Sequence, residues 1–339
     1  TGADAATLLA ADGGSVVLTN NTVDNPGYKT TTSFSSGGPR NPDSAPKPDV
    51  IAPGLSVLSA GIGTGTGPLV DSGTSMACPM TAGIAALVKQ LHPSWNGLQI
   101  KAAIMNTADS SLNTGYNVRR AGAGVVQAQK ATNSSVLATT SDQLDSIAFG
   151  YVPGSGAHSA QKSFTLTNLG SSAAIYHLDV ATNGSQQGAV VGVSPSTVTI
   201  APGSTETVQV SLSIPESAFA ALPSDDTFSI GPGGVLTVRG DIVATPDASD
   251  TPDDQTLVVP YLVVPRGLSN VTAGVPAAWT KSNSPSGKGF ASTLPLTNSG
   301  IHDGTADLYA WGIHDANDSN APMDVRDVGV QVQPGANFG

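Results

Sequence analysis

The sequence predicts a mixed α and β part followed by an all-β part, because the spacing of apolar residues changes along the chain. In the first part, Ile84, Leu87, Val88 and Leu91 recur at intervals of three and four residues, which is the spacing of one helix face. After residue 146, apolar and polar residues alternate instead, as they do in the run from Val208 to Ile214. The 339 residues are enough for two or three domains with separate cores.

Two helices are predicted in the first part. Proline is tolerated only in the first turn of a helix, so Pro79 predicts a helix that begins close to Ser75. His92-Pro93 ends this helix, and Ser94 is predicted to cap a second helix over residues 95–107.

The first helix places Ser75 at its N-terminus. Backbone N–H groups without partners and the positive end of the helix dipole favour an oxyanion at this position. A serine nucleophile in acyl transfer needs such a place, because its tetrahedral intermediate carries a negative charge on oxygen. Gly73 leaves the approach to Ser75 free of a side chain. The alternative is a buried serine that only caps a structural helix.

Four sequence blocks together resemble the subtilisin-like serine peptidases. They are Gly73-Thr-Ser-Met-Ala-Cys-Pro79, Lys47-Pro-Asp-Val-Ile-Ala-Pro-Gly54, Phe34-Ser-Ser36 and His92-Pro-Ser-Trp95. The resemblance covers residues 30–133 and implies the C-terminal part of an α/β catalytic domain with a parallel sheet. It further implies a secreted serine endopeptidase that hydrolyses proteins or peptides through an acyl-enzyme on Ser75, with Gly73 and Thr74 lining the approach to the scissile bond. Asp49 has a structural part in this family.

The resemblance also implies residues that this chain does not supply. In this family the triad Asp and His precede the serine, whereas all five histidines, His92, His158, His177, His302 and His314, follow Ser75. His92 is expected to be a helix-end histidine without a catalytic part. We therefore expect the chain to need the upstream catalytic half of the same protein, which would supply the triad Asp, the His and the oxyanion Asn, and to be inactive alone. The alternative is a non-catalytic fragment or pseudo-peptidase whose β domains mediate binding.

The rest of the chain divides into three parts by the same resemblance. Residues 1–29, with a short helix at 3–10 and a strand at 15–19, resemble the end of a protease-associated insert, and residues 134–266 resemble a fibronectin-type-III-like β-sandwich. Residues 132–146 are polar and predicted to be a linker, and Pro260 suggests an edge strand or a bulge. The motif Leu166-Thr-Asn-Leu-Gly170 recurs as Leu296-Thr-Asn-Ser-Gly300. This repeat predicts a second β-sandwich over residues 267–339, truncated at its end.

Composition and charge indicate which classes of partner the chain binds and whether it crosses a membrane. Residues 131–339 hold six basic and eighteen acidic residues, and this acidity argues against nucleic acid and anionic membranes as partners, although solubility also explains it. No stretch is long enough to span a membrane, and no leader segment is visible at the start, which resembles an interior point of a longer protein. Cys78 is predicted to be a small buried packing residue, with a thiol nucleophile as the alternative.

No cofactor is expected. Acidic loops at residues 247–254 and 315–318 could bind Ca²⁺ through carboxylate oxygens, but solvated acidic loops are the commoner explanation.

Overall fold

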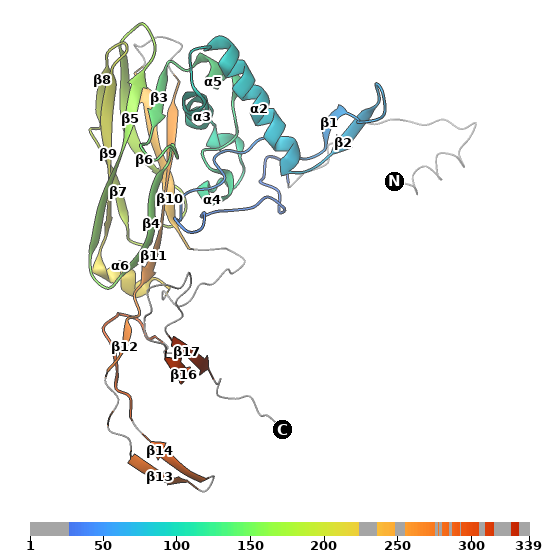
Figure 1. Ribbon diagram of the computed structural model, residues 1–339. Coiled ribbons are helices and arrows are strands. Elements are labelled where there is room, and N and C mark those ends of the chain that lie inside the picture. Colours follow the sequence, from blue (N-terminus) through green and yellow to red (C-terminus); the bar gives the residue numbers. More distant parts are fainter. Residues whose placement is uncertain are drawn as a thin grey trace, which may run out of the picture.

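The computed structural model describes residues 27–223, 236–247, 255–274, 277 and 293–304, together with the backbone of four further strands, 280–284, 287–291, 309–314 and 327–331. A helical part lies against one side of a larger β-sandwich, and a short hairpin projects from the helical part (Figure 1). The predicted helix at 3–10 and strand at 15–19 lie outside the described residues.

The helical part begins with the hairpin. Its elements are the strands β1 (Val57–Ala60) and β2 (Pro68–Asp71), the helices α2 (Thr74–Leu91) and α3 (Gly97–Asn106), the 3-10 turn η1 (Ser110–Leu112), and the short helices α4 (Val118–Ala121) and α5 (Ala128–Asn133). β1 and β2 are antiparallel, and the parallel contact in this part of the described chain is a single bridge from Ile51 to Val125.

The predicted helices are present, with corrected boundaries. Pro79 is the sixth residue of α2 and lies in the second turn, where it leaves the carbonyl of Ser75 without its helical donor. The second helix begins at Gly97, so Ser94 is not its cap. Asn96 caps it, because its side chain accepts hydrogen bonds from two backbone N–H groups and Gln99 completes a capping box.

Only part of the predicted apolar face of α2 is buried. Ile84 and Val88 join the small core around Trp95 and Ile104, but Leu87 and Leu91 are 48% and 61% exposed. The spacing of apolar residues therefore predicted the helix correctly, but it did not distinguish the buried residues of this face from the exposed ones.

Two sheets form the β-sandwich. The four-stranded sheet has the order β3-β5-β9-β7, and the five-stranded sheet has the order β4-β11-β10-β6-β8. Their strands are β3 (Val136–Thr139), β4 (Ile147–Gly154), β5 (His158–Asn168), β6 (Ala174–Thr182), β7 (Val190–Ser194), β8 (Thr197–Ile200), β9 (Thr205–Ile214), β10 (Val238–Pro246) and β11 (Leu257–Gly267). The helix α6 (Glu216–Ala221) lies at one end of the sandwich (Figure 1).

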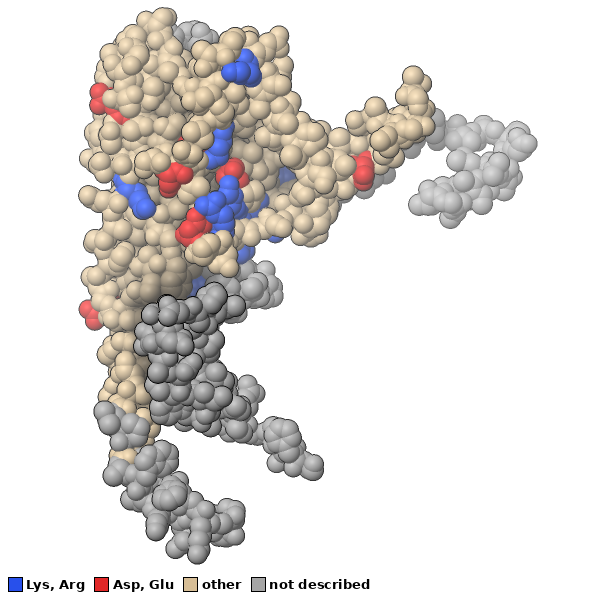
Figure 2. All heavy atoms as spheres, viewed as in Figure 1, with Lys and Arg blue, Asp and Glu red and all other residues tan. Residues whose placement is uncertain are grey.

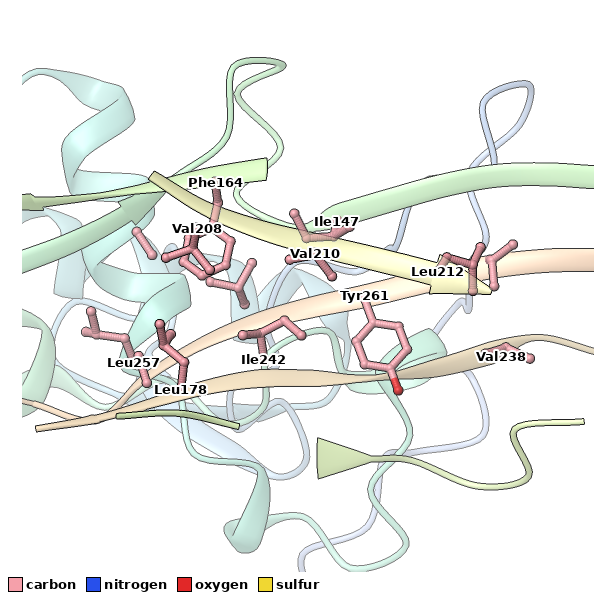
Figure 3. Packing of buried hydrophobic residues seen from close by; sticks show 14 of the residues in the cluster. Ile147, Phe164, Leu178, Val208, Val210, Leu212, Val238, Ile242, Leu257 and Tyr261 are labelled. Carbon is pink, nitrogen blue, oxygen red and sulfur yellow. The ribbon is translucent and has the colours of Figure 1, made fainter. Parts of the chain in front are cut away.

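The core between the sheets follows the alternation of the sequence. In β9 every second residue from Val208 to Ile214 is buried, and Phe164 and Tyr176 reach the same core from β5 and β6. Figure 3 shows Phe164, Val208 and Val210 facing Ile242, Leu257 and Tyr261 across the two sheets. The prediction of half-buried strands in this part of the chain is confirmed.

Two expectations for the sandwich are wrong. Residues 132–146 are not simply a linker, because β3 forms within them and Val136, Leu137 and Ala138 are buried. Of the two alternatives for Pro260, the edge strand is wrong, since β11 pairs with β10 on one side and with β4 on the other, whereas the register with β4 does shift two residues on, between Leu262 and Val263. The pairing with β4 begins only at Tyr261, so the missing N–H of Pro260 costs no hydrogen bond to that strand.

The outer face of the five-stranded sheet packs against the helical part. Val258 of β11 contacts a small cluster that includes Ala108 and Ala123. Asn106, fully buried at the end of α3, accepts a hydrogen bond from the N–H of Ala138 at 2.8 Å and donates to the carbonyl of Val258 at 3.4 Å. One side chain of the helical part thus contacts both sheets.

The sequence repeat has a structural counterpart. Strands β12 (Val271–Ala273) and β15 (Leu296–Asn298) pair as β3 pairs with the end of β5. In both copies the asparagine side chain accepts from the glycine N–H two residues on, at 2.9 Å, and donates to the carbonyl four residues on. The remaining strands of this region, β13 (Thr280–Ser284), β14 (Gly287–Ala291), β16 (Tyr309–His314) and β17 (Asp327–Gln331), form two separate antiparallel pairs.

Candidate active site

Ser75 is the second residue of α2 and is exposed to solvent. Gly73 is the N-cap of the helix, and its N–H donates to the carbonyl of Gly54 at 2.8 Å. A Cβ atom on Gly54 would lie 2.7 Å from the carbonyl oxygen of Gly73, so this close contact requires glycine at position 54. The Pro53-Gly54 turn therefore fixes the start of the helix that carries the serine.

This geometry provides an anion site beside the hydroxyl. The first N–H groups of a helix have no partner within it, and those of Thr74 and Ser75 belong to the first turn of α2. The first turn of α2 contains no acidic residue that would compete for them. An oxygen that becomes negative next to Ser75 would therefore be stabilised by backbone donors and by the helix dipole.

A cavity of about 580 Å³ lies beside the start of α2. Gly73, Thr74 and Cys78 line it from the helix, while residues 27–35 and 48–55 line it from the loops. Cys78 is exposed in this cavity, so the expectation of a buried packing residue is wrong.

The hairpin and α2 expose an apolar surface. Large apolar side chains of the hairpin and of α2 are half or more exposed, among them Leu58, Leu69, Val70 and Leu91. In Figure 2 the hairpin carries almost no charged side chains. A helix that is apolar around most of its circumference normally lies inside a protein, and α2 does not do so here.

The described histidine rings with hydrogen bonds pair away from Ser75. The ring of His92 stacks on Trp95 with 3.8 Å between centroids, and its Nε2 lies 2.8 Å from the carbonyl of Thr132, as expected for a helix-end histidine. His177 lies between Asp247 and Thr197 on the sandwich, and His302 contacts the carbonyl of Phe219. Among the described residues, no side chain forms a hydrogen bond with the hydroxyl of Ser75.

Asp49 lies in the segment below the serine turn. Its carboxylate accepts from Lys47 at 2.7 Å, and its carbonyl accepts from the N–H of Ala123. Both contacts hold the Lys47–Gly54 block in place, which agrees with a structural part for Asp49.

The described residues contain no group of three or more His, Cys, Asp or Glu that could hold a metal ion. Of the two acidic loops considered for Ca²⁺, residues 248–254 and residues 315–318 lie outside the described residues. None of the described helices has the length and apolar character needed to cross a bilayer.

Family models match two segments of the chain. Residues 15–124 match the subtilase family, and residues 138–238 match the HYDIN/CFA65/VesB-like Ig-like domain. The second match supports a β-sandwich, but it does not confirm the fibronectin-type-III-like description.

Curated relatives agree with the first match. The subtilisin-like protease SBT1.9 of Arabidopsis thaliana is 40% identical over 134 residues, covering 36% of this chain and 17% of the relative. Glyma18g48580 of Glycine max, also a subtilisin-like protease, is 43% identical over 102 residues, covering 26% of this chain and 13% of the relative. The chain thus spans less than a fifth of the length of these relatives.

Solved structures resemble the sandwich only distantly. The PapD-like domain 7 of human CEP192 is 14% identical and covers 39% of this chain and 85% of that chain, with a TM-score of 0.26. WR4, an MSP family member of C. elegans, has a TM-score of 0.22 at 11% identity, covering 38% of this chain and 98% of that chain. Scores this low do not define a common fold. The relationship that the comparisons do support is between residues 15–124 and the subtilases, a family of serine peptidases.

Proposed function

We propose that this chain is part of a secreted subtilisin-like serine endopeptidase that cleaves proteins or peptides through an acyl-enzyme on Ser75. The observation that carries the proposal is the exposed hydroxyl of Ser75 in the first turn of α2, beside a cavity and next to unpaired backbone donors. Ser75 Oγ attacks the scissile carbonyl, and the N–H of Ser75 stabilises the resulting oxyanion. Gly73 and Thr74 line the approach of the substrate.

The hydroxyl of Ser75 needs a base, and we propose that it comes from the upstream catalytic half of the same protein. A serine near its ordinary pKa is a poor nucleophile until a neighbouring group takes its proton. Loss of a single triad member lowers turnover in subtilisin by about 10⁴- to 10⁶-fold. The 339-residue chain alone is therefore expected to have negligible peptidase activity.

The exposed apolar surface supports this partner. Leu58, Val70, Leu87 and Leu91 leave the hairpin and α2 with apolar area that a folded domain normally buries. The upstream half would cover this surface and the cavity, and would bring its base to the serine. Burial of such side chains contributes about 1.5–3 kcal/mol for each one fully covered.

We propose that the remaining parts serve the same protein. Residues 1–29 would end a protease-associated insert, residues 30–133 would complete the catalytic domain, and residues 134–266 would form a fibronectin-type-III-like sandwich. Residues 267–339 would begin a second sandwich, for which the matching asparagine turns at Asn168 and Asn298 are the support.

The test is hydrolysis of an unstructured protein substrate by the complete protein, comparing Ser75→Ala with Ser72→Ala. Both variants remove one exposed hydroxyl near the start of α2, but only Ser75 is the proposed nucleophile. We expect the Ser75→Ala variant to lose at least about 10⁴-fold in kcat and the Ser72→Ala variant to stay within about tenfold. Equal effects of the two substitutions would contradict the proposal.

A non-catalytic fragment or pseudo-peptidase that binds through its β domains is the second candidate. It is favoured by one observation, the lack of a hydrogen-bonded base at Ser75 in the described residues. Asp and His motifs in the upstream reading frame would favour the peptidase, and their absence would favour the binding protein.

A further inference from the structure

A buried acid and a phenol meet where the helical part contacts the sandwich. Asp241 of β10 is 5% exposed and belongs to the face of the five-stranded sheet that α4 covers. The hydroxyl of Tyr116, in the loop before α4, lies 3.0 Å from Asp241 Oδ1 and 2.7 Å from the carbonyl oxygen of Gly122. Among the described residues, no cationic nitrogen lies within 4.0 Å of the carboxyl of Asp241.

The number of hydrogens that Tyr116 and Asp241 can donate decides which protonation state of Asp241 this geometry fits. A phenol has one hydrogen, and a carbonyl oxygen can only accept. When Asp241 is charged, Tyr116 can donate to the carboxylate or to Gly122, but one of the two short contacts lacks a hydrogen. When Asp241 is protonated, its O–H donates to Tyr116, and Tyr116 donates to Gly122, so that both contacts are hydrogen bonds.

We propose that Asp241 and Tyr116 form an acid-stabilised latch, which holds the loop of residues 116–122 on the sandwich when Asp241 is protonated and loosens when Asp241 loses its proton. The latch lies apart from Ser75 and does not depend on the proposed peptidase activity. It is a property of the contact between the helical part and the sandwich.

Burial supports the protonated state. Loss of hydration raises the pKa of Asp241 to about 7, although the hydrogen bond from Tyr116 acts in the opposite direction. Because the pKa is raised relative to the unfolded chain, protonation stabilises the folded state. The free energy that this proton contributes to folding is therefore complete below about pH 4, and the latch itself is lost as the pH rises through about 7.

The other ionisable groups around Asp241 do not replace this proton. Tyr261 of β11 is a neutral phenol of the sandwich core whose hydroxyl donates to Gln186, and its pKa is raised by burial and then by the charge of Asp241. Arg239 of the same strand donates to Asn183 and Thr237, and its pKa is lowered by burial and then by the charge of Arg119 of α4. On β6, the residue opposite Asp241 is Ala181, and the nearest ionisable residue on that face is the exposed Asp179.

The loop that the latch holds is itself part of the helical framework. Asn183 of the sandwich donates to the carbonyl of Tyr116 at 2.8 Å and accepts from the N–H of Val118. Gly122 has a positive φ of 55°, and the N–H of Ala123 donates to Asp49 at 2.9 Å. Loosening of the latch should therefore appear first as faster opening of residues 117–124.

The experiment is hydrogen exchange of the amides of residues 117–124 in the full 339-residue chain, at about pH 5.5 and about pH 8.5, corrected for the intrinsic effect of pH. We expect protection to fall at least about fivefold at the higher pH, because most of Asp241 is then charged. In Asp241→Asn, where an amide donates to Tyr116 permanently, protection should stay constant. Asp145→Asn removes another buried acid, away from the latch, and should keep the dependence of the wild type.

Constant protection in the wild type, or an unchanged pH dependence in Asp241→Asn, would overturn the proposal. If Asp241→Asn does not fold, Tyr116→Phe decides in its place. Phenylalanine cannot accept a hydrogen bond from the carboxyl of Asp241, so hydrogen exchange of the loop in this variant should depend less on pH. A pH dependence equal to that of the wild type would overturn the proposal.

Discussion

Asn106→Ala tests whether the helical part and the sandwich form one structural unit. Asn106 is fully buried, and its side chain joins α3 to β3 and to β11. Alanine leaves the buried N–H of Ala138 without its 2.8 Å acceptor, and an unsatisfied buried donor costs about 1–3 kcal/mol. The contact to Val258 is long, at 3.4 Å, and adds little.

The expected loss in the free energy of unfolding is about 2 kcal/mol, the middle of this range. Urea unfolding followed by circular dichroism measures it, with Asn96→Ala as the matched control. Asn96 is also an asparagine that binds backbone groups of α3, but it is an exposed N-cap, for which alanine costs about 1 kcal/mol. A loss for Asn106→Ala no larger than that of the control would show that this side chain does not hold the two parts together.

Two further substitutions test the local geometry. Gly122→Ala should destabilise the chain by more than about 2 kcal/mol in thermal or urea unfolding, because φ is 55° and the new Cβ would lie 2.1 Å from the carbonyl oxygen of Asp49. The control is Gly83→Ala in the open middle of α2, which should stabilise the chain by up to about 1 kcal/mol. Asp145→Asn should change stability at about pH 8 by less than about 1 kcal/mol, since burial raises the pKa of Asp145 despite Lys101 at 3.4 Å, and a marked loss in urea unfolding would show that the charge is needed.

The sequence predicted the sandwich strands well because their alternation is a local property. Residues such as Phe164 and Val208 show the period of two whatever lies opposite them. The same holds for the helix after Ser75, because its apolar residues recur at helical spacing. What the periodicity could not give is whether Leu87 and Leu91 have a partner to pack against.

Other features depend on contacts between distant residues. β3 was missed because four residues among polar neighbours become a strand only when β5 pairs with them. Pro260 looked like an edge residue, yet its place beside β10 and just before the pairing with β4 depends on register. Asp241 and Asn106 have no local signal at all, since their partners lie more than 30 residues away.

The candidate site was predicted from its motif, and its chemistry stays a proposal. The structure places Ser75 in the first turn of α2, close to where the motif predicted it, and leaves its hydroxyl exposed. The end of α2 at Leu91, with His92 as its C-cap before Pro93, also agrees with the prediction. No pattern in the sequence could give the cavity, because its walls come from loops far apart in the chain.

The most direct test of the central claim is covalent labelling of the native source with a fluorophosphonate probe, followed by peptide mapping and the intact mass of each labelled species. We expect label at Ser75 on a species much heavier than 33.8 kDa, and none on the isolated 339-residue chain. A species that contains Ser75 and stays unlabelled, under conditions that label a known subtilase, would contradict the assignment of Ser75 as the nucleophile. Label on the isolated chain would contradict the proposal that the base comes from an upstream half.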